Sequence, residues 1–220
     1  MNKQVSIVEL YDCKQEYLSA LFERCVYPWE LILQIKDYIC ELFKHKMPGY
    51  SFISENVLVG ENVKIYPGAT IEGPAIIGSG TEIRPGAFIR GSVIIGERCV
   101  IGNSSELKNS ILLDGVQVPH YNYVGDSVLG NRAHMGAGAI CSNLKADGKN
   151  VIIRAERDYE TGLRKIGAFL GDGADIGCGC VLNPGTVVGK NTSVYPLTAL
   201  RGVYPANSIV KAANTVIDKK

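Results

Sequence analysis

Aliphatic side chains recur every six residues along most of the chain. A second column, two residues before the first, holds mostly small or β-branched side chains. An α-helix has a period of 3.6 residues and cannot keep such a repeat on one face. Short strands separated by regular bends can keep it, since alternate strand residues point to the same side. The first column contains Val59, Ile65, Ile71, Ile77, Ile83, Ile89, Ile95, Ile101, Leu107 and Leu113.

Turn residues recur at a longer interval of eighteen, as shown by Gly60, Gly78 and Gly96. Three hexads therefore close one coil, and stacked coils form a triangular prism with the aliphatic column inside. The six-residue step returns from Leu170 to Leu200. Together these periods predict an all-β chain with a left-handed parallel β-helix of hexapeptide repeats over residues 51–212.

The repeat is interrupted between Leu113 and Leu170. Residues 142–165 have no period, carry many charges and contain turn signals, so they are predicted to form a loop extruded from the prism. Val151–Ile153 could form one arm of a small hairpin. Insertions in solenoids map to one face, often the binding face. Within the interruption and before the loop, inward positions are predicted at Val118, Val124, Leu129, Met135 and Cys141. Two of the steps along this column are five residues long instead of six.

Both ends of the chain differ from the repeat. Residues 1–50 show helical spacing in two segments, near 11–25 and 28–45. We expect a helical hairpin that caps the first coil, because uncovered edge strands pair with other chains. Residues 213–220 are predicted to form a short C-terminal tail.

Composition excludes several classes of function. Lys and Arg total 23 and Asp and Glu total 22, so no charge excess indicates binding to nucleic acid or a membrane surface. No apolar run is long enough to span a bilayer, and the first residues do not resemble a signal peptide. Seven irregularly spaced cysteines, including Cys178 and Cys180, fit a reducing compartment and core positions. We therefore expect a soluble cytoplasmic protein.

Three histidines are the first candidates for chemistry. His45 falls in the helical segment, whereas His120 and His134 fall in the interrupted region. A histidine at a break in the repeat faces outward and can act as a general base near neutral pH. A lone histidine is more often structural, and the residues alone leave both alternatives open.

The strings around His120 resemble a known family. Gly102–Lys108, Pro119–Asp126 and Gly136–Asn143 are similar to the acetyltransferase domain of bifunctional N-acetylglucosamine-1-phosphate uridyltransferase/glucosamine-1-phosphate acetyltransferase, of the hexapeptide-repeat acyltransferase superfamily. The similarity extends over residues 55–205, and the extruded loop looks like the archaeal branch. The resemblance implies acetyl transfer from acetyl-CoA to an amino-sugar phosphate, such as glucosamine-1-phosphate, in the supply of UDP-N-acetylglucosamine.

The resemblance also implies roles for single residues. His120 matches the general base that takes a proton from the sugar amine. Asn143 matches an asparagine beside the amine and the acetyl group, and Ala137 matches an alanine whose backbone contacts the acetyl carbonyl. The other implied contacts to the sugar phosphate are Lys108, Tyr123, Lys149 and Arg90, with Arg84 as the second choice for the arginine.

Some positions depart from the family pattern. His134 stands where the family usually has asparagine, next to the substrate. Asp172 stands where bacterial members carry a serine that touches coenzyme A. The 50 residues before the repeat are too few for a nucleotidyltransferase domain, and its glycine-rich loop is absent. Uridylyl transfer is therefore not expected.

Two other functions remain as alternatives. A γ-class carbonic anhydrase needs three zinc-binding histidines, but only His120 and His134 lie on the prism. A non-catalytic trimer that scaffolds partners or binds a nucleotide sugar is the second alternative. We expect a homotrimer in either case and no metal in the acetyltransferase. Glucosamine and its galactosamine epimer differ by one hydroxyl, so the sequence leaves the acceptor open.

Overall fold

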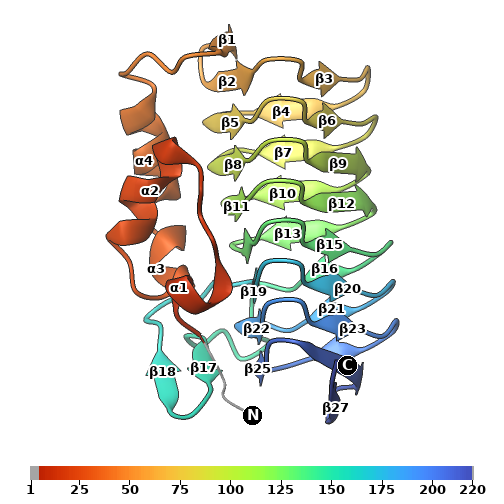
Figure 1. Ribbon diagram of the computed structural model, residues 1–220. Helices are drawn as coiled ribbons and strands as arrows, with labels where there is room; N and C mark the ends of the chain where they lie inside the picture. Colours follow the sequence, from red (N-terminus) through yellow and green to blue (C-terminus); the bar gives the residue numbers. More distant parts are fainter. Residues whose placement is uncertain (1–4, 220) are drawn as a thin grey trace.

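The computed structural model describes residues 5–219 and shows a three-sided prism of stacked coils. Each coil supplies one short strand to each of three parallel sheets, which we call face 1, face 2 and face 3 (Figure 1). The predicted left-handed parallel β-helix is confirmed. None of the helices within residues 5–219 has the length and apolar character needed to cross a membrane.

Face 1 holds the first strand of each coil. Several of its strands carry three successive apolar residues, as at Ala75–Ile77 and Val93–Ile95, and neighbouring coils pair in parallel register. The first strand, β1, pairs antiparallel with β2 and so occupies the edge of the first coil. The strands are β1 (Tyr50–Ser54), β2 (Val57–Gly60), β5 (Ala75–Ile77), β8 (Val93–Ile95), β11 (Ser110–Leu112), β14 (Val128–Leu129), β19 (Ala168–Leu170), β22 (Thr186–Val188) and β25 (Val203–Tyr204).

Face 2 holds the second strand of each coil and ends in an antiparallel hairpin. Residues 215–218, predicted as part of a short C-terminal tail, form the last strand of that hairpin. The hairpin occupies the edge at the other end of the prism. The strands are β3 (Lys64–Ile65), β6 (Glu82–Ile83), β9 (Val100–Asn103), β12 (Gln117–His120), β15 (His134–Met135), β20 (Asp175–Ile176), β23 (Ser193–Val194), β26 (Ser208–Ala212) and β27 (Thr215–Asp218).

Face 3 holds the third strand of each coil. Its outward positions are mixed, with charged, aromatic and small side chains in successive coils. The strands are β4 (Thr70–Glu72), β7 (Phe88–Arg90), β10 (Glu106–Lys108), β13 (Tyr123–Gly125), β16 (Ile140–Cys141), β21 (Val181–Leu182) and β24 (Ala199–Leu200).

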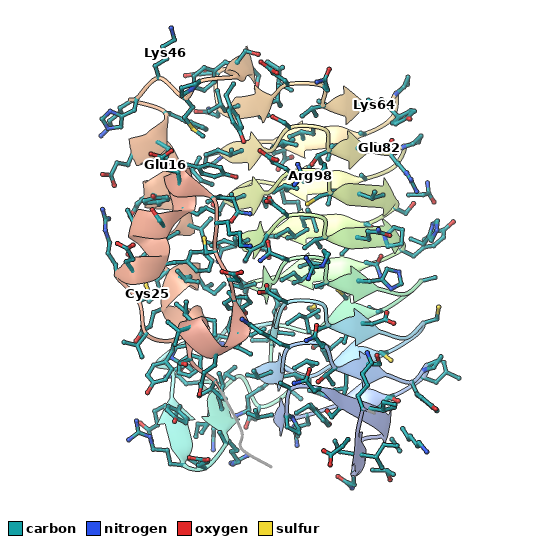
Figure 2. The ribbon with its side chains drawn as sticks, in the orientation of Figure 1. Glu16, Cys25, Lys46, Lys64, Glu82 and Arg98 are labelled. Carbon is teal, nitrogen blue, oxygen red and sulfur yellow. The ribbon has the colours of Figure 1, made fainter. Side chains whose placement is uncertain are left out.

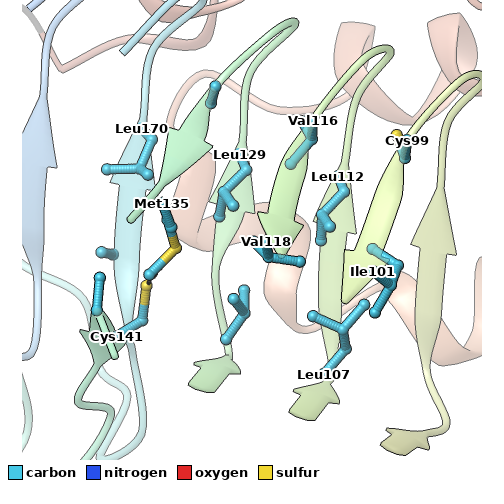
Figure 3. Close-up of a cluster of buried hydrophobic side chains, with 14 of the residues drawn as sticks. Cys99, Ile101, Leu107, Leu112, Val116, Val118, Leu129, Met135, Cys141 and Leu170 are labelled. Carbon is cyan, nitrogen blue, oxygen red and sulfur yellow. Dashed lines mark hydrogen bonds between the residues drawn. The ribbon is translucent and has the colours of Figure 1, made fainter. Parts of the chain in front are cut away.

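The interior of the prism is a continuous aliphatic column (Figure 3). One predicted member is wrong: Leu112, not Leu113, aligns with Ile95 and points inward. The coil is one residue shorter there, so the first step of five falls between Leu107 and Leu112. Leu113 points outward instead and is buried against the N-terminal helices.

Four helices lie along face 1 rather than over the first coil (Figure 1). The predicted end cap is therefore wrong in its placement. Side chains such as Ile76 and Ile94 point outward from face 1 and are completely buried against this helical layer. A strand with apolar side chains on both sides needs a cover on both sides. The helices are α1 (Ile7–Leu10), α2 (Glu16–Glu23), α3 (Pro28–Ile32) and α4 (Ile35–Leu42).

The extruded segment leaves the prism after β16 and returns at β19. It contains an antiparallel hairpin of β17 (Ile152–Arg154) and β18 (Asp158–Glu160). Tyr159 packs on Tyr27 and Trp29, with ring centroids 5.1 and 5.7 Å apart. The loop is thus held against the N-terminal helices rather than free in solvent.

Candidate functional site

A buried carboxylate organises the edge between face 3 and face 1. Asp126 is 3% exposed and accepts hydrogen bonds from Lys108 Nζ at 3.1 Å and Asn143 Nδ2 at 2.6 Å. Asn109 Nδ2 donates to the same carboxylate at 2.9 Å. We call these residues, with Tyr123, the Asp126 cluster. Lys108, Asp126 and Asn143 lie in successive coils, so the stacking of the prism brings them together.

Tyr123 lies across face 3 toward the Asp126 cluster. Its hydroxyl accepts a hydrogen bond from Asn143 Nδ2 at 3.1 Å. A Cβ atom at Gly125 would overlap the Tyr123 ring, so glycine there lets the ring lie flat on the face. Burial, helped by the carboxylates of Asp126 and Glu106, raises the pKa of Tyr123. The phenol therefore stays protonated and can donate a hydrogen bond.

The structure groups Arg90, and not Arg84, with this cluster. Arg90 is on face 3, where Nη1 pairs with Glu106 Oε1 at 2.7 Å. Arg84 follows a strand of face 2 and pairs with Glu82 at 3.3 Å. Glu82 lies on the side of the prism remote from the helices (Figure 2). Two cations on face 3, Arg90 and Lys108, are thus held by carboxylates one coil further along.

His120 lies at the other edge of face 3, where face 2 ends. Its side chain is exposed, and within residues 5–219 its ring has no hydrogen-bond partner. The backbone is fixed, because His120 N–H donates to Asn122 Oδ1 at 3.1 Å and Asn122 Nδ2 donates to Gly136 O at 2.8 Å. The buried Asn122 was missed by sequence reasoning. The sequence did contain a signal for it, because Asn122 is an amide in a column of mostly small side chains.

Three coils stack at the edge that contains His120, which we call the His120 edge. Gly138 N–H donates to His120 O at 3.0 Å, and Gly179 N–H donates to Ala137 O at 2.8 Å. Ala137 therefore lies one coil beyond His120, and the exposed Cys178 lies one coil beyond Ala137. Among the described residues, no backbone oxygen accepts from Ala137 N–H. That group is available to a ligand.

The two edges flank the same short strand. His120 precedes β13 and Asp126 follows it, so the edges are separated by a strand of three residues. At about 3.3 Å per residue the strand spans about 10 Å. Face 3 thus presents a general-base candidate on one side and a cluster of hydrogen-bonding groups on the other, where Asn109 Nδ2 also donates to Ile32 O of α3 at 3.3 Å.

Two further predicted site residues, His134 and Lys149, lie elsewhere in the chain. His134 is on face 2, where Nδ1 pairs with Asp175 Oδ1 at 2.8 Å. Lys149 is exposed in the extruded loop and contributes its backbone N–H to Asp147 at 3.0 Å. Neither contacts Lys108 within the chain. Their predicted roles therefore require a second subunit.

Asp172, predicted to face coenzyme A, lies at the edge between face 1 and face 2. Its carboxylate accepts from the backbone N–H of Asp12 at 2.8 Å and of Asn131 at 2.7 Å. Lys190 Nζ lies 3.6 Å away. Asp172 thus ties the N-terminal segment to the prism, and its carboxylate is occupied by these bonds. Its contact with coenzyme A stays a prediction.

Metal ligation finds no support in the part of the chain that the structure describes. No group of three His, Cys, Asp or Glu side chains gathers there in a way that could hold an ion.

Known proteins resemble this chain in sequence. The GMPPB C-terminal domain family matches residues 71–158. The Bifunctional protein GlmU of Methanococcus maripaludis is 32% identical over 198 residues, 88% of this chain and 48% of that protein. The GlmU of Methanocaldococcus jannaschii is 33% identical over 199 residues, with the same shares. The chain spans about half the length of these curated relatives.

Solved structures resemble it more distantly. The acetyltransferase domain of PglB from Neisseria gonorrhoeae in complex with acetyl coenzyme A has a TM-score of 0.40 and 20% identity, covering 74% of this chain and 57% of that chain. The sequence relatives are closer. By its hexapeptide-repeat prism and its extended similarity to the GlmU proteins, the chain belongs to the family of their acetyltransferase part.

Proposed function

We propose that the chain transfers an acetyl group from acetyl-CoA to the amine of an amino-sugar phosphate, such as glucosamine-1-phosphate. One observation carries the proposal: the two edges of face 3 present an exposed imidazole and a cluster of oriented donors on either side of one strand. The first suits deprotonation of an amine, and the second suits recognition of an anionic sugar.

The phosphate would bind beside Lys108 and Arg90. Both are cations, and charge-assisted hydrogen bonds to a phosphate are stronger than neutral ones. Each is already oriented by a carboxylate, Lys108 by Asp126 and Arg90 by Glu106. Tyr123 and Asn143, on the same face, can donate to sugar hydroxyls. The phosphate therefore meets groups that are already placed, which lowers the entropic cost of binding.

His120 would take the proton of the sugar amine. An amine attacks a thioester only with a free lone pair, so a proton must leave before or during attack. The imidazole of His120 is exposed at the end of β12, and no side chain of residues 5–219 occupies its nitrogens. As a neutral ring it can accept that proton near neutral pH.

The backbone N–H of Ala137, one coil beyond His120, would bind the carbonyl oxygen of the acetyl group. Attack places negative charge on the carbonyl oxygen, and a fixed backbone N–H stabilises that charge without reorganisation. The N–H of Ala137 has no backbone acceptor within the described chain and lies at the His120 edge. Acetyl-CoA would supply the acetyl group there as co-substrate. We place its thioester along the stack of His120, Ala137 and Cys178.

The proposal includes a homotrimer. The helices cover face 1 and leave faces 2 and 3 open for contact with other copies. Lys149 and His134 lie away from the Asp126 cluster in their own chain. In a trimer they would approach the face 3 of a neighbouring subunit. Light scattering with size-exclusion chromatography tests this, and a monomer at assay concentration would contradict it.

The direct test measures thiol release from acetyl-CoA in the presence of glucosamine-1-phosphate, its galactosamine epimer and other amino-sugar phosphates. His120→Gln should lower kcat by roughly 10²–10⁴-fold, the usual contribution of a general base. His45→Gln, at an exposed histidine in the helical segment, is the matched control and should keep the activity. Full activity of His120→Gln would overturn the mechanism.

A second candidate is a binding module without catalysis. One observation favours it: within residues 5–219 no group bonds to the His120 ring, whereas a general base is usually oriented by a third group. The same assay separates the two candidates. Saturable binding of the sugar phosphate without thiol release would support the binding module and contradict acetyl transfer.

A further inference from the structure

A cavity of about 810 Å³ lies near the C-terminal end of the prism, at the edge between face 3 and face 1. Its wall is the strand β17 of the extruded hairpin, which lies beside the last coils (Figure 1). The floor consists of the turns Pro184–Gly185 and Arg201–Pro205, and the rim includes Ala213–Asn214. Ligand sites in proteins commonly have volumes of about 300–1,000 Å³.

Tight packing fixes the position of the wall. Gly185 has φ +80°, and a Cβ there would lie 2.7 Å from Val151 Cγ1 and 3.2 Å from Ile153 Cγ1. Both of these side chains are buried. Gly202, with φ +89°, lies beneath the backbone of Arg154. The hairpin is therefore held against two glycine turns, and the cavity beside it is part of the folded structure.

The lining is cationic. Lys145, Arg154 and Arg201 carry positive charge and Asp147 carries negative charge, so the lining has a net charge of 3 − 1 = +2. Lys145 pairs with Asp147 at 3.2 Å and Arg154 pairs with Asp158 at 3.8 Å. Among residues 5–219, no carboxylate lies within 4.0 Å of the Arg201 guanidinium. Arg201 is thus available to an anion.

Apart from Asn214 and the Tyr204 hydroxyl, the remaining side chains of the lining are apolar. Val151, Val203 and Val216 face the cavity from three separate segments of the chain. Tyr204 joins the floor to the rim, since its hydroxyl accepts from Arg201 N–H and donates to Ala213 O, both at 3.2 Å. An anion alone would use only the cationic part. A larger molecule with an apolar portion would use both parts.

We propose that this cavity binds an organic phosphate, with the phosphate or pyrophosphate against Arg201 and Arg154 and the organic portion against the valines. Arginine binds phosphate oxygens through two parallel N–H donors. Coenzyme A and nucleotide sugars share this chemistry, so either could be the source. The site lies apart from His120, and its binding does not depend on the acetyl transfer proposed above.

Calorimetric titration of the full chain tests the proposal with three probes: coenzyme A, a uridine diphosphate sugar and inorganic phosphate. At least one organic phosphate should bind, and Arg201→Gln should weaken its binding about tenfold, as expected for loss of a charge-assisted hydrogen bond. Arg132→Gln removes an exposed arginine at another edge and should change the affinity less than about twofold. The probe that binds identifies the source.

Asn214→Asp is a second variant that should leave the fold intact, because Asn214 lies in an exposed turn of the rim. The substitution adds a negative charge beside the cavity. It should weaken the same probe several-fold. In the thiol-release assay, Arg201→Gln should keep the wild-type kcat, which separates this site from the catalytic proposal. Absence of binding to both organic phosphates, equal affinity for inorganic phosphate, or equal binding by Arg201→Gln and Arg132→Gln would each overturn the proposal.

Discussion

Face 1 and face 3 have the same backbone repeat but opposite surroundings. On face 1 the outward side chains are all apolar and lie buried beneath the helices, among them Ile94, Val128 and Phe169. On face 3 the aligned outward positions include Glu106 and Tyr123, and both are partly exposed. Inward-pointing residues are alike on both faces, so the repeat alone does not decide what a face does.

The two faces differ in the outward side chain of each strand, and each face receives one hexad of the three in every coil. Where it is apolar, the strand has to be buried on both sides, and the N-terminal helices provide the cover. Where it is polar or charged, the face stays open and can present side chains to a ligand. A rigid prism then holds Lys108 and Asn143 at fixed spacing, which is what a preorganised site requires.

The largest expected effect concerns the covered face. Phe169 points outward from β19, is completely buried and packs near Trp29, with ring centroids 6.2 Å apart. Phe169→Ala should lower the free energy of unfolding by about 3–5 kcal/mol, through lost burial and the cavity left behind. Urea denaturation measures the change.

The matched control is on the open face. Ile140 is the outward residue of β16 and is 38% exposed. In the isolated chain, Ile140→Ala should change the free energy of unfolding by less than about 0.5–1 kcal/mol, because little burial is lost. Equal losses for Phe169→Ala and Ile140→Ala would show that the two faces do not differ in the way described. Measurement at low protein concentration limits any contribution from assembly.

The second prediction concerns the buried carboxylate of face 3. Asp126→Asn keeps the shape but removes the charge that orients Lys108 and one of the two oxygens that accept from Lys108 and Asn143. We expect kcat/KM for the amino-sugar phosphate to fall about tenfold, mainly through KM, because binding groups lose their orientation. Steady-state kinetics at varied sugar phosphate measure the split.

Glu106→Gln is the comparison for this variant. It removes the carboxylate that pairs with Arg90, but that pair is partly exposed, so the expected change is below about threefold. Asp126→Glu should restore part of the lost kcat/KM, since the charge returns. If Asp126→Asn lowered only the free energy of unfolding and left KM unchanged, the carboxylate would serve the fold alone.

The sequence predicted the prism because its interior obeys a strict period, and an interior position tolerates few residue types. It misplaced Leu113, since Leu112 and Leu113 are both aliphatic and the period could not distinguish them. It also placed the helices at an end, although the signal for their true place was present. Strands such as Val93–Ile95 are apolar at all three positions, which indicates burial on both sides.

The site was less predictable than the fold. Lys108, Tyr123 and Asn143 were found through family strings, but Asp126, which holds Lys108 and Asn143, was not identified as a site residue. A buried carboxylate becomes recognisable only when its donors from neighbouring coils are known. For Asp172, the sequence did not indicate that its carboxylate accepts from the backbone N–H groups of Asp12 and Asn131.

The third prediction returns to the contact between the helices and face 1. Tyr11 is completely buried there, and its hydroxyl donates to Val128 O at 3.3 Å. Burial, with a smaller contribution from Asp172, raises the pKa of Tyr11 well above 10.0. The folded state keeps the proton while the unfolded state releases it above pH 10, so this contribution is complete below pH 10 and is lost as pH rises further.

Between pH 8.5 and 10.5, ionisation of Tyr11 in the unfolded state should therefore lower the free energy of unfolding of the wild type by about 0.8 kcal/mol. The Tyr11→Phe variant should not show this loss. Denaturant titrations of both proteins at the two pH values measure this loss. Because all other titrating groups are common to the two proteins, their contributions cancel in the difference. Parallel pH dependence in the two proteins would mean that the helical layer does not exclude water from Tyr11.

The smallest expected effect lies at the open edge of face 3. Cys178 is exposed one coil beyond Ala137, on the path proposed for acetyl-CoA, whereas Cys40 is exposed on the outer side of α4. Both thiols should react with N-ethylmaleimide, and saturating acetyl-CoA should slow labelling of Cys178 about threefold through steric cover. Peptide mass spectrometry measures both rates in one sample, with Cys40 as the internal control. Equal slowing of both thiols, or of neither, would place acetyl-CoA away from the His120 edge, and the open face would then bind the sugar without its acetyl donor.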